Sequence, residues 1–241
     1  MGFFDLFRWG LLLQALALVH FIRRRPNTLW LYAIIFLGGL GAFVYILVEV
    51  VPDLGLIRQV FDAIGRRKRI KMFEALVLEN PASGNYEELG DLYLEEKKFA
   101  RAKECYDKAI SPRSTQLDPL YRRGIAEIQL GEFPAAVTDL ESVTSREPKY
   151  DSHRAMALLA HAYANSGQPD KAEQLFEQVT QMSTLSETQL NYAAFLASQN
   201  RTAEAREWAE RVLARKATLP LYLKRRERPW FRKANALLKR L

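Results

Sequence analysis

The sequence predicts an all-α protein with an N-terminal transmembrane helical hairpin, a solenoid of about four helix pairs and a C-terminal capping helix. Three observations predict this fold. An almost uncharged apolar block fills the first fifty residues, small residues recur at intervals of 34, 36 and 33 through the middle of the chain, and a basic amphipathic segment ends it. The expected parts are a membrane anchor at 1–52, a basic juxtamembrane or capping helix at 53–82, helix pairs at 83–215 and a basic capping helix at 216–241.

The longest apolar run covers residues 28–51, where Glu49 is the only charged residue. As one helix it would reach about 36 Å, which exceeds the roughly 30 Å hydrocarbon core of a bilayer. Residues 3–22 are a second candidate, which either spans the bilayer to complete a hairpin or lies along its surface. The hairpin is favoured by small residues that would let another helix approach closely: Ala33, Gly38, Gly41 and Ala42.

Several residues of this N-terminal segment follow a known pattern. They are His20, Arg23 to Pro26, Trp30, Gly38 to Gly41 and Tyr45. These residues resemble the two-helix membrane domain that precedes bacterial cardiolipin synthases and related phospholipase D-like proteins. The resemblance covers about fifty residues. The catalytic His-x-Lys motif of those enzymes is absent, because His153 precedes Arg-Ala and His161 precedes Ala-Tyr. The resemblance therefore implies a bacterial inner-membrane anchor without the lipid chemistry.

A repeated pattern begins after Pro81. The first unit has aromatic and small residues at Tyr86, Leu89, Gly90, Tyr93, Ala102, Tyr106 and Ala109. Later units have small residues in the same slots, at Gly124, Ala136, Ala160, Ala172, Ala193 and Ala205. The pattern resembles the tetratricopeptide repeat, with units at 83–116, 117–152, 153–185 and 186–215, although Arg123 and Glu127 replace the usual Leu and Tyr. An ordinary helical bundle would explain the apolar spacing but not its recurrence.

The turns and the groove of these units follow from the pattern. Gly131, Gly167 and Asn200 are expected at turns within pairs, where a left-handed backbone is needed. The resemblance implies a right-handed superhelix whose concave face binds a protein or peptide. Its usual groove positions correspond here to Glu87, Asp91, Leu94, Glu95, Tyr121, Ile125, Ile128, Gln129, Arg154, His161, Asn165 and Leu190. An acidic end and an apolar middle would suit a peptide with basic residues around an apolar anchor, unless these charges only solvate a surface.

Positive charge lies at the two ends of the chain. Residues 1–71 and 201–241 are basic, whereas 72–200 are acidic, so membrane lipids are expected as partners and nucleic acid is not. The residues expected at the membrane surface are Arg23, Arg24, Arg25, Arg66, Arg67, Lys68 and Arg69. With a hairpin, this distribution favours repeats in the cytoplasm. The C-terminal stripe that includes Trp230 and Phe231 either caps the last pair or docks on anionic lipid or a partner, helped by Lys224, Arg225, Arg226 and Arg228.

No enzyme activity, metal or cofactor is expected. His153 and His161 lie eight residues apart, too far for joint metal ligation on a helix, and Cys105 occupies a packing position. The predicted function is a non-catalytic scaffold that binds a protein or peptide partner at the bacterial inner membrane. The alternative is a regulatory subunit of a membrane lipid or envelope-biogenesis enzyme that acts through its membrane domain.

Overall fold

The computed structural model describes residues 3–24, 27–50, 56–111 and 116–241. The chain divides into two compact units, 1–71 and 72–241, and the division falls within helix α5 (Leu56–Glu79). All regular secondary structure in the described ranges is helical.

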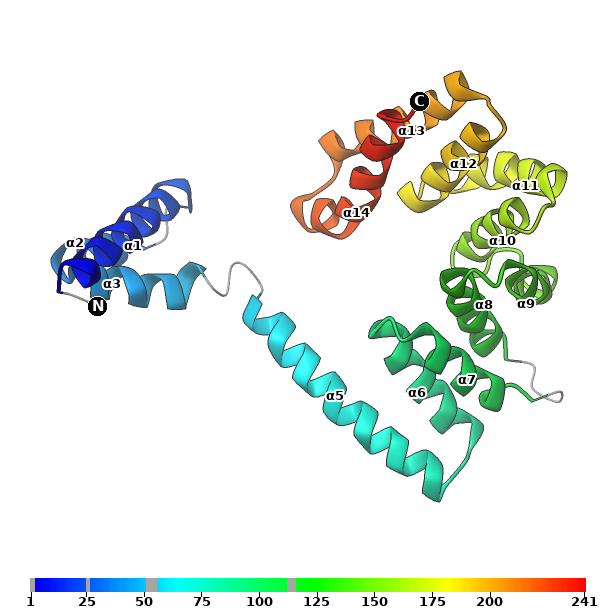
Figure 1. The fold of residues 1–241 in the computed structure, drawn as a ribbon, viewed down its shortest axis with the longest axis horizontal. Helices are drawn as coiled ribbons and strands as arrows, with labels where there is room; N and C mark the ends of the chain where they lie inside the picture. The colour runs from blue at the N-terminus through cyan, green and yellow to red at the C-terminus, as the bar shows by residue number, and fades with distance from the viewer. Residues whose placement is uncertain (1–2, 25–26, 51–55, 112–115) are drawn as a thin grey trace. The chain divides into compact units, whose positions relative to one another are not determined.

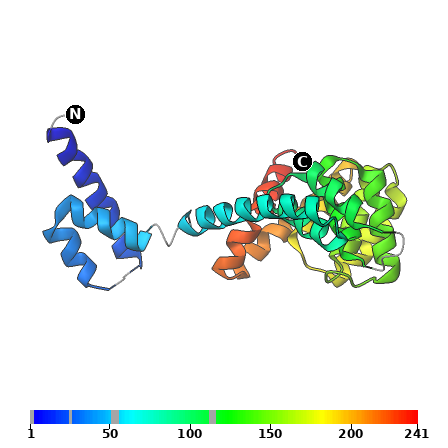
Figure 2. The same ribbon diagram turned by 90° about the horizontal axis from the view of Figure 1, so that it is seen from below.

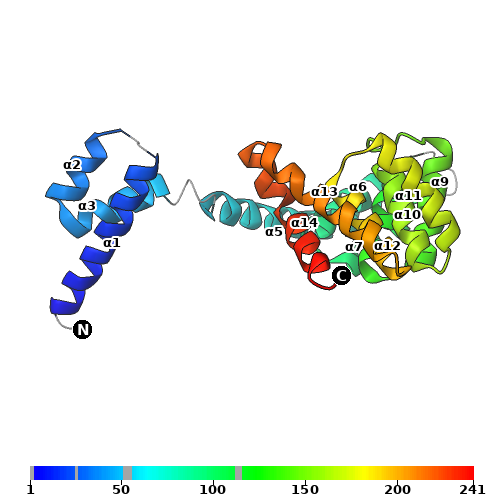
Figure 3. The same cartoon turned by 90° about the horizontal axis from the view of Figure 1, so that it is seen from above.

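The N-terminal unit consists of helices that cross at glycines. It contains α1 (Phe3–Arg24), α2 (Leu29–Phe36), α3 (Gly38–Tyr45) and the π-helix η1 (Ile46–Val50). α1 packs across α3 (Figure 3). A Cβ atom on Gly39 would lie only 2.9 Å from the Cα atom of Gly10, so this crossing requires glycine.

Polar side chains in this unit find partners on a neighbouring segment. The Gln14 amide donates to the carbonyl oxygen of Ile34 over 2.9 Å, and the Trp30 indole donates to Glu49 over 2.9 Å. The His20 ring is hydrogen bonded to the Tyr45 hydroxyl, also at 2.9 Å. The polar side chains of Gln14, His20 and Trp30 therefore have hydrogen-bond partners within the unit.

The prediction of one continuous helix over 28–51 is wrong. α2 ends at Phe36 and α3 begins at Gly38, so the segment bends between them (Figure 2). Gly38 has a φ of +58°, and a Cβ atom on Gly41 would lie 2.0 Å from the carbonyl oxygen of Ala33. The backbone at Gly38 and the close approach at Gly41 both depend on glycine, whereas the sequence pattern indicated only helix packing for these residues. Among the described residues, no helix combines the length and the apolarity needed to cross a membrane.

The second unit is built from antiparallel helix pairs that follow one another along an arc (Figure 1). The pairs are α6 (Ser83–Glu95) with α7 (Phe99–Ala109), α8 (Asp118–Leu130) with α9 (Phe133–Arg146), α10 (Arg154–Asn165) with α11 (Pro169–Met182), and α12 (Ser186–Ser198) with α13 (Thr202–Thr218). The first helix of each pair lies on the inner side of the arc.

Small residues allow the helices of a pair to approach closely. A Cβ atom on Gly90 would lie 2.8 Å from the Tyr106 ring, and one on Gly124 would lie 3.0 Å from the Leu140 side chain. The predicted left-handed turns are confirmed, with φ values of 79° at Gly131, 78° at Gly167 and 62° at Asn200.

Helix α14 (Leu221–Leu238) covers the end of the array. Its Phe231 and Ala234 are buried in one cluster with Leu190 and Val212. Because α13 continues to Thr218, the capping helix begins at Leu221 rather than at the predicted residue 216.

Candidate groove on the inner helices

Two adjoining pockets share the residues Asp151 and Arg154. The first has a volume of about 560 Å³ and lies between the pairs that begin with α6, α8 and α10. The second, of about 430 Å³, lies between α10, α12 and α14. We call the two together the groove. It runs along the inner side of the arc from the first pair to the capping helix.

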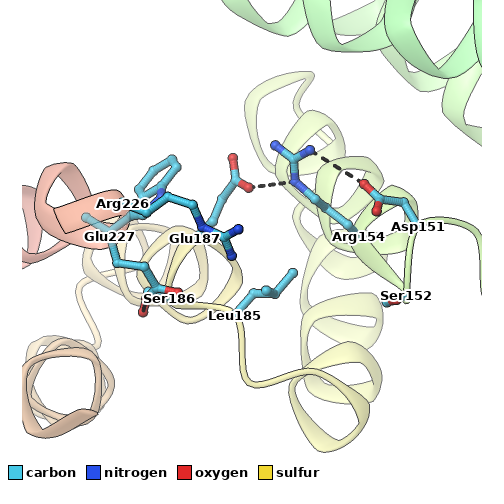
Figure 4. Close-up of a pocket in the computed structure, with 9 residues that line it drawn as sticks. Asp151, Ser152, Arg154, Leu185, Ser186, Glu187, Arg226 and Glu227 are labelled. Carbon is cyan, nitrogen blue, oxygen red and sulfur yellow. Dashed lines mark hydrogen bonds and ion pairs between the residues drawn. The ribbon is translucent and has the colours of Figure 1, made fainter. Parts of the chain in front are cut away.

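Arg154 is held at the centre of the groove by two carboxylates (Figure 4). Its guanidinium donates to Glu187 over 2.9 Å and pairs with Asp151 at 3.5 Å. It also donates to the Tyr121 hydroxyl at 3.3 Å. Burial opposes the charge on Arg154, but the hydrogen bond to Glu187 and the nearby acidic charges outweigh it and raise the pKa of the guanidinium. The arginine is thus a fixed cation that links the third and fourth pairs.

A left-handed loop brings Asp151 to this position. Asp151, Ser152 and His153 have φ values of 47°, 54° and 68°, which side chains other than glycine seldom adopt. The Tyr121 hydroxyl donates to Asp151 over 2.5 Å, and the Tyr150 hydroxyl donates to Asp118. The contacts of Asp151 with Tyr121 and Arg154 therefore hold a backbone of high energy at the centre of the groove.

Helix α14 forms the far wall of the groove. Arg226, Glu227 and Trp230 line the second pocket together with Leu185 and Glu187. Figure 4 shows Arg226 and Glu227 on α14. The hydroxyl of Ser186 donates to the buried carboxylate of Glu227, which ties α12 to α14 at this wall. The capping helix therefore shapes the groove as well as closing the core.

Carboxylates gather beside the first pocket, where Asp118 lines the groove and Glu87 and Asp91 lie just outside it. Asp91 accepts a hydrogen bond from the Tyr106 hydroxyl at 2.6 Å and pairs with Arg122 at 3.3 Å. Burial and the charges of Asp91 and Asp118 raise the pKa of Glu87. Burial also raises the pKa of Asp91, although the Tyr106 hydrogen bond lowers it. An added positive charge here would relieve the repulsion among these acids.

The structure brings four of the predicted groove residues together, Leu94, Tyr121, Ile125 and Arg154. The other predicted residues lie outside the two pockets: Glu87, Asp91, Glu95, Gln129, His161 and Asn165. Of these, Gln129 and Asn165 are exposed, and burial lowers the pKa of His161, whose ring packs on Phe133 at 6.0 Å.

Two predicted groove residues need correction. Ile128 is buried in the main core cluster, and Leu190 is buried in the cluster beneath α14. Neither is available to a ligand. The cause for Leu190 is the capping helix, which folds over the position that would be open at the end of an uncapped array.

Several groove residues were not predicted from the sequence. They are Asp118, Arg122, Tyr150, Asp151, Ser152, Leu185, Ser186, Glu187, Arg226, Glu227 and Trp230. Many lie in the connections between pairs, beyond the helix positions used for the prediction. One signal was present, because the interval of 36 residues indicated a longer connection before the third unit, and this connection contains the Asp151 loop.

The predicted membrane-surface cations are only partly described. Arg25 lies outside the described residues, and Arg23 and Arg24 are described only as the last residues of α1. Arg67, Lys68 and Arg69 are exposed on α5, and Arg66 is partly exposed.

The second unit is an α-solenoid of helix pairs with a groove along its inner helices. Three family models match it, all described as the tetratricopeptide repeat, at residues 84–111, 127–183 and 159–220. The chain is a tetratricopeptide repeat protein. These matches begin at residue 84, so they give no support to the resemblance of the N-terminal segment to cardiolipin synthases.

Solved structures share this fold at low sequence identity. YrrB, described as a tetratricopeptide repeat protein with an unusual peptide-binding site, has a TM-score of 0.54 and 17% identity over 65% of this chain and 81% of its own. MamA from Desulfovibrio magneticus RS-1 has a TM-score of 0.57 and 16% identity over 68% of this chain and 93% of its own. A thermophilic repeat protein of Thermus thermophilus has a TM-score of 0.52 and 20% identity over 74% of this chain and 96% of its own. At these identities the similarity establishes the fold alone.

Proposed function

We propose that this protein is a non-catalytic scaffold that binds a peptide segment of a partner protein in the groove. The observation that carries this proposal is the prearranged centre of the groove, where Arg154 is fixed by Asp151, Glu187 and Tyr121 between two open pockets. A fixed polar centre reduces the entropy lost on binding. The relative YrrB, with its peptide-binding site, supports the same use of this fold.

The groove suits a ligand with a basic residue next to an apolar side chain. Glu87, Asp91 and Asp118 would attract a cation at one end. Leu94 and Ile125 offer apolar contact in the first pocket, and Trp230 offers it in the second. The complementarity of charge would set the orientation of the peptide, and the apolar contacts would add affinity.

A fluorescence-polarisation screen of the full chain in a mild detergent tests this proposal. The probes are short labelled peptides with Lys or Arg on both sides of Leu or Phe, and scrambled peptides of the same composition. Glu87→Lys should weaken the binding of the best peptide by roughly tenfold, the effect of about 1.4 kcal/mol. This change also removes acidic repulsion, so folding should survive.

Glu104→Lys is the matched control. It makes the same change of charge on the exposed surface of α7, away from the acidic residues whose charges act on Glu87. An equal loss of affinity in both variants would mean that total charge, and not the groove, determines binding. Unchanged affinity in Glu87→Lys would place the site elsewhere.

We further propose that the N-terminal unit attaches the scaffold to a bilayer, the bacterial inner membrane, with the repeats in the cytoplasm. The support is its exposed apolar surface. Of the 22 large hydrophobic residues exposed among the described residues, 16 lie between Trp9 and Val48. A surface of this kind in water would favour aggregation, whereas lipid would cover it. The basic residues from Arg66 to Arg69 would then lie near anionic headgroups.

Membrane attachment and orientation have separate tests. Release of the full chain from membranes by alkaline carbonate would contradict attachment through the apolar surface. Orientation is tested in intact cells with an impermeant thiol reagent and the variants Arg24→Cys and Leu241→Cys, each in a Cys105→Ala background. Labelling at Leu241→Cys in intact cells would place the repeats outside, whereas labelling there only after the cells are permeabilised would place them in the cytoplasm. Labelling at Arg24→Cys reports the side of the N-terminal unit separately.

The alternative function is a regulatory subunit of a membrane lipid or envelope-biogenesis enzyme. It is favoured by the same apolar unit, whose part-buried hydrogen bonds between side chains and neighbouring segments are more than a simple tether needs. Joining residues 72–241 to an unrelated membrane helix separates the two functions. Retained function would exclude a regulatory role for the N-terminal unit, and loss of function would support it.

A further inference from the structure

A third pocket, of distinct chemistry, lies between the end of α13 and the outer side of α14. Its volume is about 250 Å³, and five cations line it, Lys216, Lys224, Arg225, Arg228 and Arg232. No carboxylate is among the described residues that line it. We call it the cationic pocket. It shares no residue with either pocket of the groove.

The spacing of residues on α14 explains how the cations gather. Arg225, Arg228 and Arg232 follow one another at intervals of three and four, so they lie on one side of the helix. Phe231 turns inward and is buried beneath them with Ala234. Lys216, at the end of α13, completes the pocket from the neighbouring helix. The fold thus holds these charges together on a packed surface.

These positive charges are not neutralised within the described part of the protein. No salt bridge to any of the five is found there, and the Lys224 ammonium group donates only to the carbonyl oxygen of Ala217, at 3.4 Å. The acidic residue of α14, Glu227, is engaged with Ser186 on the groove side. Like charges held close together repel, so an anion in this pocket would be stabilised by all of them.

Exposed apolar side chains at the start of α14 indicate where such an anion comes from. Leu221 lines the pocket and is 78% exposed, and the adjacent Tyr222 is 71% exposed. Cations beside exposed apolar and aromatic residues are typical of surfaces that bind anionic lipid, because the cations meet headgroups while the apolar groups enter the boundary of the acyl chains. A site for a free anion in water would gain nothing from Leu221 and Tyr222.

We infer that the cationic pocket binds the phosphate-containing headgroup of an anionic phospholipid. The sequence left two roles open for this segment, a cap and a lipid contact. The structure places the aromatic stripe inward and the cations outward, so one helix can serve both roles. This inference does not depend on peptide binding in the groove or on the N-terminal unit.

The test measures how fast a water-soluble amine reagent labels individual lysines of the full chain in a neutral detergent. Three additions are compared at equal concentration: dihexanoyl phosphatidylglycerol, dihexanoyl phosphatidylcholine and inorganic phosphate. Phosphatidylglycerol should slow the labelling of Lys216 and Lys224 severalfold. Lys239 is exposed, lies beyond the pocket and should label at an unchanged rate.

Matched variants separate the pocket from general charge attraction. Arg225→Gln with Arg228→Gln should raise the phosphatidylglycerol concentration needed for protection by roughly tenfold. Lys239→Gln with Arg240→Gln removes the same charge outside the pocket and should change it less than twofold. Circular dichroism and thermal melting would verify that both variants stay folded.

Three results would overturn the inference. Equal protection by phosphatidylcholine would show that the pocket does not prefer an anionic headgroup. Equal protection by inorganic phosphate would assign the pocket to a free anion. Equal effects of the two double variants would mean that a diffuse field, and not the pocket, attracts the lipid.

Discussion

The guanidinium of Arg123 donates two hydrogen bonds, each 2.7 Å long, to the two carboxylate oxygens of Asp139. Asp139 is buried, and Arg123 also pairs with Asp107 at 2.8 Å. Arg123 stands where the repeat pattern normally has leucine. The bidentate ion pair therefore lies within the second helix pair, and the contact of Arg123 with Asp107 joins that pair to the first.

Replacing Arg123 should destabilise the repeats strongly. In Arg123→Met, the carboxylates of Asp139 and Glu127 would stay buried without their principal cation, which should cost about 3–5 kcal/mol. Chemical denaturation followed by circular dichroism measures this. Arg211→Met is the control, because Arg211 pairs with Glu207 on the surface and is 52% exposed, so its loss should cost less than about 1 kcal/mol. Equal losses would contradict the structural role of the buried pair.

Glu127 should make the stability of the repeats depend on pH. One of its carboxylate oxygens is buried without a hydrogen-bond partner, and the other lies 3.7 Å from Lys103 and 4.0 Å from Arg123. Burial, and then the charge of Asp139, raise the pKa of Glu127 to about 7, although Arg123 and Lys103 oppose them. Because the folded state holds this proton more tightly than the unfolded state, stability should fall as the pH rises from about 4.5 to about 7.

The variant Glu127→Gln isolates this contribution. It cannot release a proton, so its stability relative to the wild type should increase by roughly 3 kcal/mol through the same pH range and level off above about pH 7. Denaturant titrations at several pH values measure the difference. Glu104→Gln, at an exposed position, should show no such growth. A difference that does not vary with pH would contradict the raised pKa.

Two glycines in α6 should respond oppositely to alanine. Gly90→Ala would force a Cβ atom to within 2.8 Å of the Tyr106 ring, and the resulting displacement should cost about 1–3 kcal/mol. Gly84→Ala meets no atom within 4 Å and should be neutral or stabilising by up to about 1 kcal/mol. Thermal melting of the two variants compares them directly. A stable Gly90→Ala variant would mean that the α6–α7 contact is looser than the structure indicates.

The sequence predicted well those features that depend on nearby residues. Gly131, Gly167 and Asn200 were found because a left-handed turn restricts the residue type. The four helix pairs were predicted from small residues at fixed intervals. Such residues are needed where two helices approach closely, as Gly90 approaches the Tyr106 ring. Local chemistry and the repeat interval together were enough to define the solenoid.

The groove was harder to predict because distant segments build it. Leu190 was expected in the groove, but α14 covers it. The repeat pattern does not indicate against which residues a terminal helix will pack. Asp151 reaches Arg154 only through three left-handed residues that no simple pattern predicts. Similarly, Arg123 was recognised as a departure from the repeat, but its partner Asp139 is set by tertiary packing.

The thiol of Cys105 should be almost inert in the folded protein. It is buried, and burial raises the pKa of the thiol to about 11, so only about one molecule in a thousand would carry the reactive thiolate at pH 8. An impermeant maleimide at pH 8 should therefore label native Cys105 at least about a hundredfold more slowly than the cysteine of Cys105→Ala with Leu241→Cys. In denaturant the two rates should become equal. Fast labelling of Cys105 without denaturant would mean that the α6–α7 pair opens readily, and it would make the Cys105→Ala background essential for any measurement of orientation.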